Sequence, residues 1–214
     1  MSWFITGTDT GVGKTWFSRL LVSALRENGI HAAGYKPVCC GDRDDAIALA
    51  EASGGLTVEE INPVYLQAGV APKVAAMLDN SRVNPGAILA DCKQFEKRFD
   101  TVVIEGAGGW RVPLADGYDM ADLATDIGHP VIVVVANRLG ALNHTILTVE
   151  DIRASDLEVA GLVLNHLQDE LDTAAVTNKG VIEELTGAPI LAEIIHGQDF
   201  LDVDPFLQLV EART

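Results

Sequence analysis

Cysteine is scarce in this sequence of 214 residues, and the three cysteines are Cys39, Cys40 and Cys92. An odd number of cysteines, two of them adjacent, does not suit a closed disulfide framework. No histidine or cysteine partners stand at the spacing of zinc ligands, so a zinc site is not expected either. We therefore expect reduced thiols and a cytoplasmic protein.

Positive charge is also scarce, because 15 Lys and Arg residues face 31 Asp and Glu residues and the formal net charge is −16. Nucleic acids and anionic membranes are bound through clustered Lys and Arg, so neither partner is expected. The same balance means that an anionic ligand must be held by local features of its site, against a repulsive overall field.

Long apolar runs are missing as well. The longest strongly apolar run, at residues 131–136, is far too short to cross a bilayer. The N-terminus has no basic region followed by a long apolar stretch, so a signal peptide is not expected.

The sequence does contain short apolar segments that alternate with helical patterns. Continuous apolar runs are typical of strands buried on both faces. Expected strands are at residues 3–6, 32–36, 101–105, 130–136, 159–165 and 189–194. Expected helices are at residues 14–28, 43–53, 85–98, 141–154 and 173–186. This order predicts one α/β domain over residues 1–214, with a mostly parallel sheet and helices on both faces.

The loop GTDTGVGKT, which follows the first expected strand, is similar to a phosphate-binding P-loop. Five residues separate Gly7 from Gly13, whereas the usual pattern has four. Glycines allow backbone N–H groups to point inward, and the following helix adds positive potential at its N-terminus. Lys14 can reach outer phosphates and the Thr15 hydroxyl can bind magnesium. The alternative is an ordinary glycine-rich turn, but this strand–loop–helix context favours a P-loop NTPase-like site.

Charged residues follow two other expected strands. Glu105 ends the run TVVIE before GAGG, and such a carboxylate suits a magnesium-side acid. Lys36 ends the second strand in GYKPV and should emerge at the same edge as Lys14. Asp45 lies near a helix start and could be a second magnesium ligand. The alternatives are a solvated acid at Glu105, a surface cation at Lys36 and a cap or turn residue at Asp45.

Together these motifs resemble the dethiobiotin synthetase family. The likeness includes TGTDTGVGKT, AGYKPV, NP at 62–63, APKVAA at 71–76, VVIEGAGGWRVPL at 102–114 and LGALNHTILT at 139–148. Five residues inside the first loop are the habit of this family. The resemblance implies an ATP- and Mg²⁺-dependent closure of a cyclic urea from 7,8-diaminononanoate and CO₂, through a carbamate that ATP phosphorylates. It also implies a homodimer.

The resemblance assigns roles to individual residues. It makes Lys14 and Lys36 catalytic, and it gives the metal to Thr15, Asp45 and Glu105. The implied nucleotide-binding residues are Thr10, Gly11, Val12, Gly13, Lys14, Thr15, Trp16, Asp45, Glu105, Gly106, Ala107, Gly108 and Asn165, the last for adenine or, alternatively, as a polar cap after its strand. The implied substrate-binding residues are Cys40 and the helix start Gly140, Ala141, Leu142 and Asn143, which the partner subunit would supply for the substrate carboxylate.

The sequence departs from the family in places. The loop CCGDRDDA is shorter than usual, and Cys40 stands where a Ser is common. AEIIHGQ lacks the Pro that often follows EI. One alternative is a related ATP-binding regulatory or sensory domain without turnover. Another is a partition-type dimeric ATPase, which would carry a signature Lys where this chain has Asp9.

Overall fold

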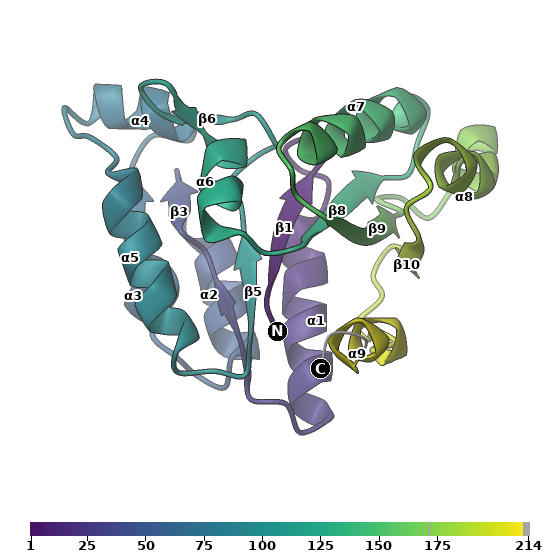
Figure 1. Cartoon of the computed structure of the whole chain (residues 1–214), viewed down its shortest axis with the longest axis horizontal. Helices are drawn as coiled ribbons and strands as arrows, with labels where there is room; N and C mark the ends of the chain where they lie inside the picture. Colours follow the sequence, from purple (N-terminus) through teal and green to yellow (C-terminus); the bar gives the residue numbers. More distant parts are fainter. Residues whose placement is uncertain (171, 212–214) are drawn as a thin grey trace.

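The computed structural model describes residues 1–170 and 172–211. Six parallel strands form its central sheet in the order β10-β9-β8-β1-β5-β2 (Figure 1). The strands are β1 (Trp3–Gly7), β2 (Ala32–Tyr35), β5 (Thr101–Glu105), β8 (Val131–Ala136), β9 (Val159–Asn165) and β10 (Ile190–Ile194). Successive parallel strands leave from β1 first to one side and then to the other, so the sheet has its switch point beside β1.

Helices cover both faces of the sheet, as the sequence predicts. The helices of eight or more residues are α1 (Lys14–Glu27), α2 (Asp44–Ala52), α5 (Pro85–Glu96), α6 (Met120–Ile127), α7 (Ala141–Ala154), α8 (Thr173–Thr186) and α9 (Asp204–Glu211), counted over the described residues. Alternate residues of β8 belong to different cores: Val133 packs with residues of α5 to α8, whereas Val134 packs with residues of α1 and α9. Every residue of β8 is buried, which explains its continuous apolar run.

Several short elements were not expected. They are β3 (Val38–Cys40), α3 (Val58–Ile61), β4 (Val64–Leu66), α4 (Pro72–Leu78), β6 (Pro113–Ala115) and β7 (Tyr118–Asp119). β3 pairs with β4 and β6 pairs with β7 in two small sheets. Elements of two to seven residues carry too little periodicity to be found from sequence. The longer α6 and α9 were also missed.

The five helices and six strands that the sequence predicts all exist, and none of their ends differs from the prediction by more than two residues. One difference bears on the site, because β2 ends at Tyr35 and leaves out Lys36. The Lys36 N–H donates to the carbonyl of Ile61, and the Lys36 carbonyl accepts from the side chain of Asn62. Lys36 therefore lies outside the sheet, and its backbone is held by the last residue and the C-cap of α3. No helix within the described residues is long and apolar enough to cross a membrane.

Candidate active site

The glycine-rich loop joins β1 to α1 at the switch point of the sheet. Gly13 is the N-cap of α1 and has a φ of 91°, a left-handed conformation that favours glycine. A Cβ at this position would lie 2.0 Å from the Asn165 side-chain nitrogen, which itself donates to the Val12 carbonyl at 2.9 Å. Asn165 thus holds the loop through the Val12 carbonyl. The N-cap residue Gly13 has no side chain to cap α1, so the first N–H groups of the helix can receive an anion.

Lys14 lies inside the loop with 7% of its surface exposed. Its ammonium donates to the Asp9 carbonyl at 3.3 Å, so it folds back across the loop. Burial lowers the pKa of Lys14 to about 8, although the Glu105 carboxylate opposes the shift. A buried lysine at the mouth of a phosphate loop gains a favourable partner when a phosphate arrives.

Three predicted residues from three distant segments meet beside this loop. The Thr15 hydroxyl lies 2.6 Å from Asp45 Oδ1 and 2.7 Å from Glu105 Oε1. Asp45 comes from the first turn of α2, and Glu105 ends β5. One hydroxyl proton can serve only one of these two carboxylates at a time, so the oxygen cluster is short of positive charge.

Lys36 supplies part of that charge. Its ammonium lies 2.6 Å from Asp45 Oδ2 and 2.6 Å from Glu105 Oε1. Burial works against the charge on Lys36, but Glu105 and Asp45 outweigh burial and raise the pKa of Lys36. Burial also works against the charge on Asp45, but the Lys36 ammonium outweighs burial and holds the pKa of Asp45 below its ordinary value. Both residues are therefore charged at neutral pH.

The chemistry of the cluster fits a magnesium ion. Glu105 is fully buried, and its second oxygen, Oε2, has no hydrogen-bond partner among the described residues. Magnesium in nucleotide sites takes one or two carboxylates and completes its coordination with phosphates and water. Within residues 1–170 and 172–211, no group of three or more His, Cys, Asp or Glu could hold a metal. Two carboxylates and a hydroxyl would therefore need a phosphate to complete the site.

A cavity of about 460 Å³ opens from this cluster. Its polar lining includes Thr10, Lys36, Cys40 and Asp45, and its glycine-rich wall includes Gly108. Its other lining residues are Val38, Cys39, Gly41, Asp42, Gly69, Val70, Ala71, Pro72, Ala107 and Val112. The volume lies within the usual range for small-molecule sites, roughly 300–1,000 Å³. The mostly apolar wall from the 69–72 loop was not assigned from the sequence, although the APKVAA motif includes part of it.

Other predicted site residues lie outside this cavity. Trp16 is in the first turn of α1, where its ring nitrogen donates to the Gln198 carbonyl and Arg19 lies over its ring. Gly106 lies beyond Glu105, and its carbonyl accepts from Lys36 at 3.3 Å. The segment Gly140–Asn143 forms the N-cap and first turn of α7, as expected, but it does not line the cavity.

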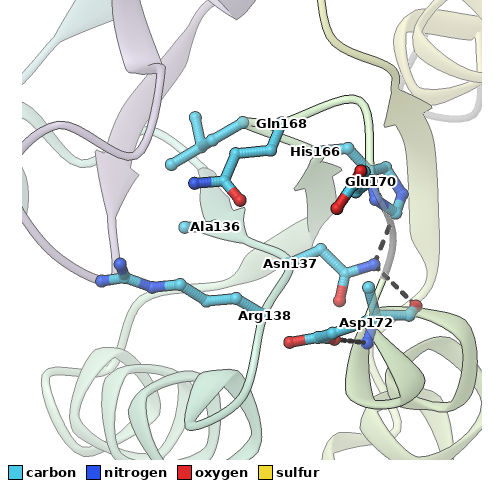
Figure 2. Close-up of a pocket in the computed structure, with 9 residues that line it drawn as sticks. Ala136, Asn137, Arg138, His166, Gln168, Glu170 and Asp172 are labelled. Carbon is cyan, nitrogen blue, oxygen red and sulfur yellow. Dashed lines mark hydrogen bonds between the residues drawn. The ribbon is translucent and has the colours of Figure 1, made fainter.

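A smaller cavity of about 120 Å³ lies at the ends of β8 and β9. Figure 2 shows Asn137 hydrogen-bonded to His166, with Arg138 extending away from them and Gln168 lying above Arg138 in the view. None of the residues assigned from the sequence lines this cavity. It is therefore separate from the cluster around Glu105.

Comparison with known proteins identifies the family. A family model described as an AAA domain matches residues 2–199. The ATP-dependent dethiobiotin synthetase BioD of Akkermansia muciniphila is 49% identical to this chain over 97% of the chain and 98% of that protein. The chain belongs to the dethiobiotin synthetase family. BioD of Aromatoleum aromaticum is 38% identical over 97% of both proteins.

Solved structures agree on the fold. The septum site-determining protein MinD from Pyrococcus horikoshii, complexed with Mg-ADP, superposes with a TM-score of 0.53. That match is 19% identical and covers 91% of this chain and 82% of MinD, so it shows the fold alone. The resemblance to dethiobiotin synthetases that the motifs predict is confirmed, and so is the P-loop fold class.

Proposed function

We propose that this chain is an ATP- and Mg²⁺-dependent enzyme that closes a cyclic urea from 7,8-diaminononanoate and CO₂, giving dethiobiotin. In this reaction CO₂ adds to one amine to form a carbamate. A carbamate oxygen then attacks the terminal phosphorus of ATP, and ADP leaves. The neighbouring amine attacks the carbamate carbon and releases inorganic phosphate. Each step places negative charge on oxygen, so the site must supply cations.

One observation carries the proposal. Lys36 lies between the oxygen cluster of the loop and a cavity that also reaches Cys40, so one ammonium borders both the phosphate end and the organic substrate space. The curated relatives named ATP-dependent dethiobiotin synthetase match almost the whole chain. A chain that only bound ATP would not need a substrate-sized cavity beside its loop.

The residues divide between two tasks. Lys14, the loop N–H groups and the start of α1 would hold the phosphates. Thr15, Asp45 and Glu105 would hold magnesium, which supplies positive charge to the phosphate oxygens when bound. Lys36 would stabilise the carbamate and the departing phosphate from the cavity side. Cys40 would contact the substrate. The remaining nucleotide assignments, including Trp16, Gly106 to Gly108 and adenine recognition by Asn165, are part of the same proposal.

We extend the proposal to a homodimer of single-domain chains in the cytoplasm. The Gly140–Asn143 turn lies outside the cavity of its own chain, so a partner subunit would have to bring it to the substrate. Free N–H groups at a helix N-terminus attract carboxylates. This arrangement would let a protein with a net charge of −16 hold an acidic substrate. Neither a partition-type ATPase nor a regulatory domain is favoured by any contact in the site.

The test is product formation. The purified chain is incubated with 7,8-diaminononanoate, bicarbonate, ATP and Mg²⁺, and the cyclic urea is followed by mass spectrometry. Product should require all four components. ATP hydrolysis that continues without urea formation would instead support a non-synthetic ATPase.

A further inference from the structure

The segment between Lys36 and Asp45 is held from outside the active site by the corner that joins α3 to β4. This corner, residues 58–66, was not assigned a role from the sequence. Gly41 is fixed on both sides: its N–H donates to the Leu66 carbonyl at 2.9 Å, and its carbonyl accepts from the Tyr65 hydroxyl at 2.9 Å. The short loop is therefore hydrogen-bonded along β4.

Asn62 is the buried centre of this corner. Only 2% of its surface is exposed. Its side-chain nitrogen donates to the carbonyl of Lys36 at 2.8 Å and to the carbonyl of Val64 at 2.9 Å. With the Lys36 N–H bound to the Ile61 carbonyl, both backbone polar groups of Lys36 are held by consecutive residues. The backbone from which the Lys36 ammonium reaches Glu105 cannot shift without breaking these bonds.

Arg43 connects the same corner to the start of α2. Its Nε donates to Asn62 Oδ1 at 3.2 Å, and its Nη2 donates to the carbonyls of Asn62 and Val58 at 2.9 and 3.2 Å. Arg43 is the N-cap residue of α2, two positions before Asp45. Its outer contacts are an ion pair with the exposed Glu59 and a stacking contact with Tyr65.

We propose that Arg43 and Asn62 are positioning residues that hold Asp45 and Lys36 in register with Glu105. This inference rests on the proposed function, because it takes Asp45 as a metal ligand and Lys36 as a catalytic group. Asn62 holds the Lys36 backbone, and the Arg43 side chain holds the N-terminus of α2 against the same corner. The hydrogen bond between the Arg43 and Asn62 side chains links these two anchors. The shortened loop thereby keeps Asp45 in the site.

The shape of the guanidinium matters here. Arg43 reaches a side-chain oxygen and two carbonyls at once through three differently directed N–H groups, whereas a lysine ammonium is a point charge. Arg43→Lys should therefore behave more like Arg43→Met than like the unaltered chain. Arg98 is the matched control, because it pairs with Glu60 of the same α3 helix and does not contact Lys36, Asn62 or Asp45.

The experiment measures ATP binding by calorimetry at increasing Mg²⁺, without the diamine. Arg43→Met and Arg43→Lys should raise the Mg²⁺ concentration for half-maximal binding about tenfold, the lower end of what loss of a metal ligand's support produces. Arg98→Met should leave it unchanged. Asn62→Ala should also lower kcat for urea formation at saturating Mg²⁺ and ATP, because the Lys36 backbone loses an anchor.

The double variant Arg43→Met with Asn62→Ala should lose less than the sum of the single losses, because the two side chains act through one bond. Thermal unfolding identifies the variants that fold, and Arg43→Lys carries the test if Arg43→Met does not. Folded Arg43 variants with an unaltered Mg²⁺ dependence would overturn the inference. If the unaltered chain binds Mg-ATP but makes no urea, the proposed reaction fails while the calorimetric comparison still decides the role of Arg43.

Discussion

At the scale of single residues, Lys14 is the cation that we expect to contribute most to phosphate transfer. Lys14→Ala should lower the rate of urea formation at least about a hundredfold, equivalent to about 3 kcal/mol of transition-state stabilisation. The reason is that its ammonium is the buried cation of the loop and nothing replaces it. The rate is measured by steady-state mass spectrometry, with Lys179→Ala as a control because the exposed Lys179 pairs with Glu193. Turnover near the unaltered rate would remove Lys14 from the mechanism.

Cys40 tests the substrate end of the same cavity. It is half-buried and lines the cavity. Cys39 also borders the cavity but is buried, as is Cys92, and burial raises the pKa of both these thiols to about 12. Cys40→Ser should keep activity, because a hydroxyl is a better donor to an anionic oxygen than a thiol. Cys40→Leu should abolish turnover and spare ATP binding. Steady-state kinetics with the diamine varied, beside calorimetric ATP titration, measure both.

Cys92→Leu is not a useful comparison because Cys92 is fully buried in the core. Cys40→Ala is better, since it shortens the side chain without filling the cavity and should retain turnover. If Cys40→Leu turns over normally, the substrate lies elsewhere in the cavity.

The positions of the charged residues at the strand ends could be predicted from the sequence. The residues that hold their backbone in place could not. Lys14, Lys36 and Glu105 could be found because parallel strands bring their carboxyl ends to one edge. Asp45 could be found as a candidate, but its contacts with Thr15 and Lys36 could not be predicted. The neighbouring sequence does not decide whether an acid near a helix start caps that helix or turns toward a metal site. The roles that we propose for Arg43 and Asn62 rest on hydrogen bonds at the α3–β4 corner, and these bonds join residues far apart in the sequence.

At the scale of elements, the strands and helices that form the layers were predicted because each has a strong period or a continuous apolar run.

The glycine-rich loop requires a particular backbone conformation at Gly13, and Gly13→Ala tests this requirement. A methyl group there would take a left-handed conformation and meet Asn165, so ATP affinity should fall at least about tenfold as the loop and the α1 start shift apart. Calorimetric ATP titration measures the loss.

Gly55 provides the matched control for this substitution. It has a φ of 84° but a Cβ there would meet no atom within 4 Å. Gly55→Ala should therefore carry the same backbone strain, roughly 1–2 kcal/mol of stability, and leave ATP binding unaltered. If both alanine variants weaken ATP binding equally, the contact with Asn165 is not what the loop requires.

At the scale of the whole molecule, the sheet order places the loop between strands that lead to the two sides of the site. Glu105 comes from the β5 side and Asn165 from the β9 side. The α7 start, by contrast, stands away from the cavity of its own chain. The proposed active site shared between two copies would account for that separation.

Mixing two inactive variants tests the shared site. Lys14→Ala damages the phosphate loop, and Asn143→Glu places negative charge where the partner would receive the substrate carboxylate. A mixed dimer would contain one site with both changes and one with neither. Random mixing should restore about a quarter of the unaltered activity. A mixture no more active than its components, with subunit exchange shown by sedimentation of tagged chains, would contradict the shared site.

The most direct test of the central claim follows the atoms of CO₂. A single turnover is run with bicarbonate labelled by heavy carbon and heavy oxygen, and both products are analysed by mass spectrometry. We expect heavy carbon in the cyclic urea and one heavy oxygen in the released phosphate, because the carbamate oxygen attacks ATP and leaves with the phosphoryl group. Phosphate whose new oxygen comes only from water, with no labelled urea, would contradict it.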